Sequence, residues 1–421
     1  MHTLWIVMSL KQQQQRVPIS LIAIRTLALT IAFALGSITT TIHTLSLLAP
    51  ADVLSGAPPP EGAPQSALET GGDEDGGGDS SGSASSTPSS ATSTVMAFAM
   101  KYDLLTHQKF VGSLRKSGFD GNIILGVEAG IDAKIRSYLE EKGVTLRELQ
   151  FANCTYDWEV KAGNSHSVER NTCAAQYPNI KVRWSRFPLQ RDWLRDCSEC
   201  TGPVLISDYR DAIFQENPFA AGAPPVRGLQ VFEEHRSITT DHWLVQSPVM
   251  KCKGIVFKNR PMLCSGTTIG TRDAMLQYLG SMYDEMSVWI ADTKCHFEMN
   301  GDDQSIHNYL FYSGKLPYAI PIPHRTGIVH TAGAQGSIIL HAHRERLKEE
   351  KDMETGEASR SPFTGTTKGM NWIGTQFDLT DEKGYFVNMD GTRSRVVHQH
   401  DRFGPNLASW LSSGEGKKIW D

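Results

Sequence analysis

Short apolar runs alternate with amphipathic segments after residue 94. Val95–Met100 and Asn122–Val127 are apolar runs that predict buried strands. Asp103–Phe119 and Ile131–Gly143 carry apolar residues at helical spacing, and each has a glycine at or near its end, which predicts two helices. Val144–Phe151 is either a third strand or the start of another turn. Strands and helices alternating at this length are typical of βαβ units and a parallel sheet.

The second half of the chain is richer in polar residues and loops. Helices are predicted over Arg272–Met286 and Asp303–Ser313. The stretch Leu263–Leu279 begins with small residues, which predict a loop that opens the first of these helices. Asp302 is predicted to cap the second helix.

A buried strand, Val204–Ile206, leads into two carboxylates and a guanidinium: Asp208, Arg210 and Asp211. Ligands of open parallel sheets bind beyond the carboxyl ends of the strands. Residues three apart point to opposite sides of a straight strand, so Asp208 and Asp211 meet one ion only if the chain turns between them. The next residues, Ala212–Phe219, read as a short helical turn stopped by proline. The stretch is either a divalent-cation site, since Mg²⁺ and Mn²⁺ prefer carboxylate oxygens, or a solvated strand exit.

An apolar segment precedes the predicted domain. Residues 26–49 hold no Asp, Glu, Lys or Arg, and this uncharged segment is long enough for a membrane-spanning helix. Lys11, Arg16 and Arg25 come before it, so residues 1–25 are predicted to be cytoplasmic and the following chain lumenal, as in a single-pass type II protein. A cleaved signal peptide is the alternative interpretation.

Residues 51–94 differ in composition from the rest of the chain. Every charged residue there is acidic, and Gly, Ser, Pro and Ala are frequent while aromatic residues are absent. Such a segment buries too little apolar surface to offset its ordering entropy, so it is predicted to be a disordered, self-repelling linker. The whole chain has 421 residues and a net charge of −5, which gives no basic character for nucleic-acid binding.

All seven cysteines follow the apolar segment. In a lumenal domain some of them should form disulfides and one should be left over. The CSEC stretch, Cys197–Cys200, has redox or zinc spacing, but without a second such pair it is interpreted as a structural disulfide or as loop cysteines. Asn153 begins an Asn-Cys-Thr glycosylation pattern, which agrees with a lumenal location.

Five blocks in the predicted domain resemble one known family in their order along the chain. They are similar to the nucleotide-diphospho-sugar transferase-like proteins of plants and algae, Golgi-type glycosyltransferases with a GT-A fold. The resemblance covers most of Val95–Leu411 and is specific for the superfamily but not for a donor or an acceptor. The blocks are LISDYRDAIFQENPF (205–219), SGTTIGTR (265–272), GDDQSIHNYLFYSG (301–314), GIVHTAG (327–333) and VVHQHDRFG (396–404).

The resemblance implies an α/β fold, a GT-A-like single domain over 95–421 with a Rossmann-like nucleotide-binding half and a mixed acceptor-side half. It also implies that Asp208, Asp211 and His398 hold Mn²⁺ or Mg²⁺, which bridges the diphosphate of a nucleotide-sugar donor. The family's usual Asp-x-Asp spacing is not kept, so which acid touches the metal stays open. Asp303 is the matching catalytic acid.

Five further residues are implied to bind the nucleotide or the sugar. They are Arg210, Ser265, Gly266, Gln304 and His400. Arg210 either contacts phosphate or pairs with Asp211, and His400 is either a ligand-binding or a surface residue.

The predicted function is therefore metal-dependent transfer of a sugar to a glycan or glycoprotein acceptor, by an enzyme held in the Golgi or ER membrane. Two alternatives remain from the sequence. One is a lumenal domain that binds glycans or a partner without turnover, and the other is a metallo-hydrolase that uses the His398-x-His400-Asp401 cluster.

Overall fold

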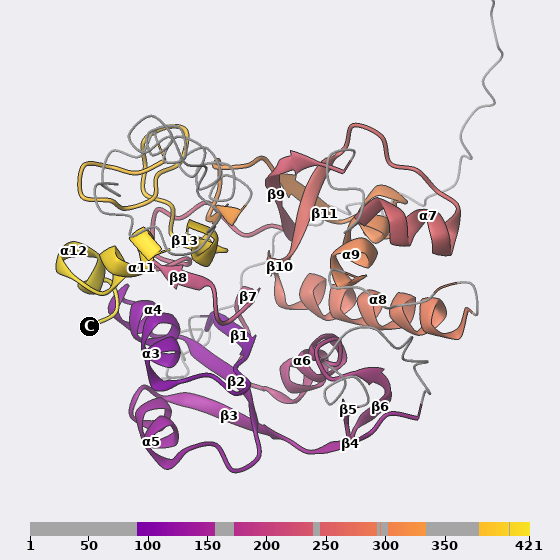
Figure 1. Ribbon diagram of the computed structural model, residues 1–421, viewed down its shortest axis with the longest axis horizontal. Coiled ribbons are helices and arrows are strands. Elements are labelled where there is room, and N and C mark those ends of the chain that lie inside the picture. Colours follow the sequence, from indigo (N-terminus) through magenta and orange to yellow (C-terminus); the bar gives the residue numbers. More distant parts are fainter. Residues whose placement is uncertain are drawn as a thin grey trace, which may run out of the picture. The chain divides into compact units, whose positions relative to one another are not determined.

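Seven strands form the main sheet in the part of the chain that the structure describes. The computed structural model describes residues 91–155, 172–238, 245–292, 295, 302–333, 379–403 and 405–421. The order across the main sheet is β11-β9-β10-β7-β1-β2-β3 (Figure 1). The strands are β1 (Thr94–Phe98), β2 (Asn122–Glu128), β3 (Val144–Leu149), β7 (Val204–Ser207), β9 (Leu229–Ser237), β10 (Pro261–Gly270) and β11 (Ala319–Ile322).

The inner parallel strands β7, β1 and β2 are buried on both faces, whereas the edge strand β3 has exposed positions. Strands β7, β1, β2 and β3 run parallel, as the alternating pattern predicted. Along β1, Val95 and Ala97 point into one apolar core while Met96 points into the other. A strand covered on both faces needs apolar residues at successive positions, which is why these strands read as continuous apolar runs. The strand within Val144–Phe151 is confirmed.

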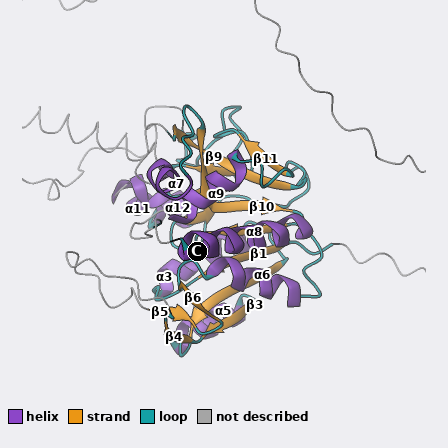
Figure 2. Ribbon diagram, turned by 90° about the vertical axis from the view of Figure 1, so that its right-hand side faces the viewer, coloured by secondary structure: helices purple, strands orange, loops and turns teal. Residues whose placement is uncertain are grey.

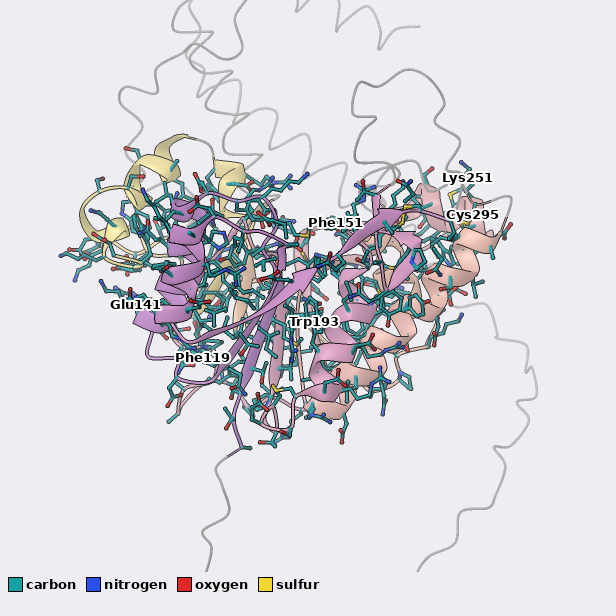
Figure 3. All side chains as sticks on the ribbon, turned by 90° about the horizontal axis from the view of Figure 1, so that it is seen from below. Phe119, Glu141, Phe151, Trp193, Lys251 and Cys295 are labelled. Carbon is teal, nitrogen blue, oxygen red and sulfur yellow. A yellow bond between two sulfur atoms is a disulfide. The ribbon has the colours of Figure 1, made fainter. Side chains whose placement is uncertain are left out.

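Helices cover both faces of the sheet (Figure 2). On one face lie α3 and α4, joined by a π-helical turn over Gln108–Gly112, and α5; on the other lie α6, α8 and α9 (Figure 1). Trp193 on α6 stacks on Phe98 at the end of β1, with ring centroids 5.4 Å apart, so α6 is fixed against the parallel half (Figure 3). The helices are α3 (Leu104–His107), α4 (Ser113–Lys116), α5 (Ala133–Glu141), α6 (Arg186–Asp196), α7 (Ser247–Lys253), α8 (Arg272–Ala291), α9 (Asp302–Tyr312), α11 (Pro405–Leu411) and α12 (Gly414–Lys417).

The prediction of a loop before Arg272 is wrong, and the predicted parallel sheet continues into antiparallel strands on that side. The small-residue stretch before that helix is strand β10, which runs antiparallel to both β7 and β9. Its pairing with β9 shifts register between Cys264 and Thr268, so the strand is irregular where its residues are smallest. The composition of this segment favours a loop. It is nevertheless a strand, because β10 forms hydrogen bonds with β7 on one side and with β9 on the other. The described fold is thus mixed α/β with a parallel-rich central sheet.

A second small sheet contains the segment predicted to be a helical turn. Ala212–Phe214 is strand β8, and it pairs antiparallel with β13 (Val396–His398), which in turn pairs parallel with β12 (Val329–Thr331). The helical prediction was wrong because the partner strand comes from a distant part of the sequence. A third sheet is formed by β4 (Phe151–Asn153), β5 (Thr172–Ala174) and β6 (Tyr177–Lys181).

Three disulfides join six of the seven cysteines, so the prediction that some would pair and one would be left over is confirmed. Cys154–Cys173 joins β4 to β5, and Cys252–Cys295 ties α7 to the segment after α8 (Figure 3). Cys197–Cys200 confirms the structural interpretation of the CSEC stretch. Cys264 is left unpaired and is buried.

No helix within the described ranges is both long enough and apolar enough to span a bilayer. The predicted cytoplasmic segment 1–25, the predicted anchor 26–49 and residues 51–90 of the predicted linker lie outside the described residues. The fold itself begins one residue earlier than predicted, because Thr94 is the first residue of β1.

Glu285 on α8 joins three helices and gives a stability prediction. Its side chain is 7% exposed and lies 2.9 Å from Lys253 Nζ, at the end of α7, and 2.6 Å from Lys315 Nζ, just after α9. The indole of Trp289 donates a further hydrogen bond to it. Glu285→Ala leaves both lysines without their carboxylate, so we expect the free energy of unfolding to fall by about 3 kcal/mol, the low end for a broken buried ion pair.

Urea unfolding of Glu285→Ala measures this effect. Glu141→Ala is the matched control, because Glu141 is 72% exposed and pairs only with its neighbour Lys142. A change of less than about 1 kcal/mol in the Glu285 variant would show that the three helices do not depend on this carboxylate.

Candidate metal centre

The two aspartates of the candidate site flank a tight turn between two sheets. Asp208 follows β7 of the main sheet, and Asp211 directly precedes β8 of the small sheet. The turn is anchored by Tyr209, which is buried, bonds His107 Nδ1 through its hydroxyl at 2.7 Å and packs on Phe110. The chain therefore turns where the sequence required it to turn if both carboxylates were to meet one ion.

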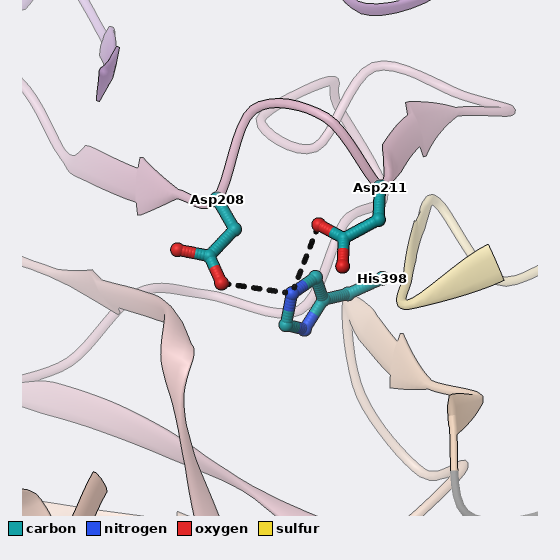
Figure 4. Close-up of side chains that lie close together, drawn as sticks. All are labelled: Asp208, Asp211 and His398. Carbon is teal, nitrogen blue, oxygen red and sulfur yellow. Dashed lines mark ion pairs between the residues drawn. The ribbon is translucent and has the colours of Figure 1, made fainter. Parts of the chain in front are cut away.

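His398 completes a cluster with these two carboxylates (Figure 4). It is the last residue of β13, whose pairing with β8 carries it to the turn. One ligand atom from each of Asp208, Asp211 and His398 lies within 4.8 Å of the others. Nε2 of His398 is 3.5 Å from Asp208 Oδ2 and 3.7 Å from Asp211 Oδ1. We call these three residues the Asp–Asp–His cluster.

The imidazole of His398 is fully buried, and its Nε2 has no hydrogen-bond partner among the described residues. A buried polar atom without a partner is unfavourable by about 1–3 kcal/mol, so a native structure normally offers it something to bind. Here it points at two carboxylates that are too far away to accept a good hydrogen bond. The gap between the three groups has the donors that Mn²⁺ or Mg²⁺ takes, carboxylate oxygens with one imidazole nitrogen.

Gly266 forms a wall of this gap. Its carbonyl accepts a 2.6 Å hydrogen bond from the backbone N–H of Asp208. A Cβ added to Gly266 would lie 2.4 Å from His398 Cε1 and 2.5 Å from Asp208 Oδ2. The prediction that Gly266 belongs to a pocket-lining loop is corrected: it lies in a central strand, and the absence of a side chain leaves room for the cluster.

The charges of the cluster perturb one another. Burial would raise the pKa of Asp208, but Arg186 and His398 hold it well below the usual range of an aspartate. Burial raises the pKa of Asp211, which is 7% exposed. Burial alone would lower the pKa of His398, but the Cys264 sulfur and the two carboxylates outweigh it and the pKa lies well above its ordinary value. A bound cation would offset the negative charge that the two carboxylates bring together here.

Arg186 links the cluster to the predicted catalytic acid. It is the first residue of α6, and its guanidinium binds Asp208 through Nη1 and Asp303 Oδ2 through Nη2, the latter at 2.6 Å. Its side chain is 17% exposed and that of Asp303 is 19% exposed. Sequence reasoning missed Arg186, because nothing in the stretch KVRWSRFPLQR (Lys181–Arg191) distinguishes this arginine from Arg183 and Arg191. Asp303 is thus connected to Asp208 of the cluster through the guanidinium of Arg186.

Three other residues predicted to bind the nucleotide or the sugar are not members of the Asp–Asp–His cluster. Gln304 donates a 2.9 Å hydrogen bond to Glu234, a buried carboxylate on β9. Ser265 is buried within β10. Arg210 is 56% exposed and lies 3.0 Å from Asp401 and 3.8 Å from Asp211, so it contacts the site at its edge.

His400 does not join the cluster. The chain turns at Gln399, with φ of 59°, and leaves β13 for a short 3-10 helix, His400–Phe403. The side chain of His400 is buried, not on the surface, and its backbone N–H donates to the Asp211 carbonyl. Burial lowers the pKa of His400 to about 4, so the ring is neutral at physiological pH.

A cleft of about 680 Å³ opens beside Asp208 and Asp211. It lies at the carboxyl ends of β1 and β7, where parallel sheets bind their ligands. Five basic side chains and four aromatic rings face it, which suits a ligand that combines phosphate groups with a planar ring. The lining residues are Phe98, Met100, Lys101, Tyr102, Phe151, Thr172, Val182, Arg183, Arg186, Ser207, Asp208, Tyr209, Arg210, Asp211, Gln399 and Arg402.

Asn153, the predicted glycosylation residue, is exposed at the end of β4. The hydroxyl of Thr155 in the same pattern donates to the Pro178 carbonyl. The asparagine is therefore on the surface that a modifying enzyme would reach, and its glycosylation stays a prediction.

No protein-family model matches this chain, and no curated protein sequence matches it.

Proposed function

We propose that this protein is a metal-dependent glycosyltransferase that moves a sugar from a nucleotide-sugar donor to a glycan or glycoprotein acceptor in the secretory pathway. The observation that carries the proposal is the convergence of Asp208, Asp211 and the unpartnered Nε2 of His398 at the mouth of a basic cleft. A site for a cation next to a basic, aromatic-lined cleft fits a nucleoside diphosphate with its sugar.

The residues of the cluster would hold Mn²⁺ or Mg²⁺ through two carboxylates and one imidazole. The bound cation supplies positive charge against the leaving diphosphate. Arg210, together with Lys101 and Arg183 in the cleft wall, adds fixed positive charge where the phosphates would lie. The rings of Tyr102 and Phe151 offer apolar faces for the base.

Asp303 is the proposed catalytic acid of the acceptor side. Its carboxylate is held by Arg186, which also holds Asp208, so its position relative to the cation is fixed by one side chain. An ionised carboxylate there would position the acceptor hydroxyl or stabilise positive charge on the sugar. Asp302 was predicted to cap α9, but the helix begins at Asp302, which is therefore its first residue and not its cap.

The arrangement of the main sheet supports a GT-A-like fold with a nucleotide-binding half and an acceptor-side half. Strands β3, β2, β1 and β7 form a parallel, Rossmann-like half whose carboxyl edge borders the cleft. The antiparallel strand β10, followed across the sheet by β9 and then β11, forms the mixed half, which would face the acceptor. The halves join where β7 pairs with β10; Asp208 directly follows β7, and Gly266 lies on β10.

Of the two alternative functions, the metallo-hydrolase is disfavoured by the position of His400, which lies outside the Asp–Asp–His cluster. The non-catalytic lumenal domain has no observation in its favour. Three disulfides and the exposed Asn153 support a lumenal location, with the N-terminal segment as membrane anchor.

The full-length protein, solubilised from membranes, should turn over at least one nucleotide sugar only when Mn²⁺ or Mg²⁺ is added. Asp211→Asn should reduce this turnover by at least about 100-fold. Losing a residue that only hydrogen-bonds to a metal ligand already weakens metal affinity by about 10–100-fold, and Asp211 is itself a proposed ligand. Release of nucleoside diphosphate from a panel of donors, with and without metal, measures it.

Asp401→Asn is the matched control. Asp401 pairs with Arg210 at the edge of the site and is not in the cluster, so its variant should stay within a few-fold of the wild type. Full activity of both Asp208→Asn and Asp211→Asn would remove the proposed metal centre.

A further inference from the structure

Cys264 is the one cysteine that forms no disulfide, and it lies against the Asp–Asp–His cluster. It belongs to β10, is 1% exposed, and its sulfur is 3.4 Å from Nδ1 of His398. The same strand contributes Gly266, which leaves space beside the same ring. Two residues of one strand therefore lie beside the His398 ring: Cys264 contacts its Nδ1, and Gly266 leaves room at its Cε1–Nε2 edge.

The two nitrogens of His398 have different surroundings. Nε2 faces the carboxylates of Asp208 and Asp211 and has no hydrogen-bond partner among the described residues. Nδ1 faces the sulfur of Cys264. A neutral imidazole carries one proton, so Nε2 has a free lone pair for a cation only when the proton is on Nδ1. An Nδ1–H buried at this point needs an acceptor, and the sulfur is the acceptor within reach.

We propose that Cys264 is a positioning residue: its sulfur accepts a hydrogen bond from the Nδ1–H of His398, which orients the ring and keeps the Nε2 lone pair directed at the cation. The inference rests on the proposed metal-dependent function. Metal-binding histidines generally donate their second N–H to a neighbouring acceptor, and losing that acceptor weakens metal affinity by about 10–100-fold.

A packing role for Cys264 predicts a different result from a positioning role. Cys264→Ala and Cys264→Ser both remove the sulfur and leave a similar small gap. If the residue only fills space, serine is no better than alanine, because it buries a hydroxyl. If it accepts the proton of Nδ1–H, serine keeps an acceptor oxygen and alanine does not.

Mn²⁺ titration of the full-length protein by calorimetry, with Mn²⁺ alone as the ligand, separates the two. We expect Cys264→Ala to weaken the Mn²⁺ dissociation constant by about 10–100-fold and Cys264→Ser to stay within about 3-fold of the wild type. Melting temperatures measured without metal report the effect on packing separately. We expect the melting temperatures of the two variants to be similar. Wild-type affinity in Cys264→Ala, or equal losses in both variants, would overturn the positioning role.

The same titration separates this inference from the proposed function. If the wild type binds Mn²⁺ with the expected rank order of variants but turns over no nucleotide sugar, the transferase proposal fails and the role of Cys264 stands. If the wild type binds no Mn²⁺, both are overturned.

Discussion

Gly266→Ala should abolish tight Mn²⁺ binding. The new methyl group would lie 2.4 Å from Cε1 and 2.8 Å from Nε2 of His398, and 2.5 Å from Oδ2 of Asp208. Neither neighbour can withdraw easily, because His398 ends a paired strand and Asp208 is bonded to the Gly266 carbonyl and to Arg186. Overpacking of this kind is unfavourable by about 1–3 kcal/mol, and here the strain falls on two metal-binding groups. We expect Mn²⁺ affinity to fall about 100-fold, which corresponds to about 2.7 kcal/mol.

Calorimetric titration with Mn²⁺ and thermal melting together test this. Gly280→Ala is the matched control: the position is in α8, and the nearest atom to an added Cβ is the flexible Arg191 side chain at 3.7 Å. Alanine is favoured over glycine in a helix by about 1 kcal/mol, so the control should be at least as stable as the wild type and bind Mn²⁺ normally. Undiminished Mn²⁺ affinity in Gly266→Ala would mean that the cation does not lie between His398 and Asp208.

Arg186→Met should damage both the fold and the site. The guanidinium neutralises Asp208 and Asp303 together, and each of these carboxylates would be left without its cation in a mostly buried place. Removing one partner of a buried pair is unfavourable by about 3–5 kcal/mol. We expect a loss of this order in the free energy of unfolding and a loss of at least about 100-fold in kcat, because the two carboxylates no longer keep their relative position. Arg186→Lys should recover only part of this, since one ammonium group cannot serve two carboxylates as a planar fork does.

The pH profile makes the Arg186 prediction specific. In the wild type, Arg186 keeps the pKa of Asp208 below that of an unfolded chain, so the pair contributes stability above the unfolded pKa, and this is lost only as pH falls through the lower folded value. In Arg186→Met the burial of Asp208 remains and the larger of its two compensating charges is gone, so the pKa of Asp208 rises although His398 still lowers it. Mn²⁺ affinity should therefore begin to fall at a higher pH than in the wild type.

Mn²⁺ titration from neutral to mildly acidic pH measures that shift. Arg195→Met is the control, because Arg195 is on the same helix, is 59% exposed and pairs only with Asp192. An unchanged pH dependence in Arg186→Met would show that Arg186 supports the fold without tuning the cluster.

The parallel half of the fold was predictable because its pattern is local. Val95–Met100 and Asn122–Val127 read as strands since both faces of each are buried, and burial on both faces gives a continuous apolar run. The structure of Ala212–Phe214 and of Leu263–Gly270 was not predictable in this way. Both are strands because of distant partners, and their own residues favour turns or loops.

The residues of the candidate site also differ in whether the sequence could identify them. Asp208, Asp211 and His398 were singled out together through a family resemblance, and the structure brings their side chains within reach of one ion, while their role as ligands stays a prediction. Arg186 and Cys264 were not found. One is among several similar arginines and the other among seven cysteines, and only the packing of α6 and β10 against the turn distinguishes them.

The pairing of β8 with β13 makes the order of synthesis matter. Asp211 leaves the ribosome long before His398, because β8 comes from the middle of the folded region and β13 from its last part. A domain generally folds as a unit, so the cluster cannot be completed while the nascent chain still lacks the His398 imidazole. The buried partner of the two carboxylates arrives only when β13 adds to β8. Catalytic competence would thus be withheld from unfinished chains, and a cation bound to the completed cluster would stabilise only molecules whose C-terminal segment has docked.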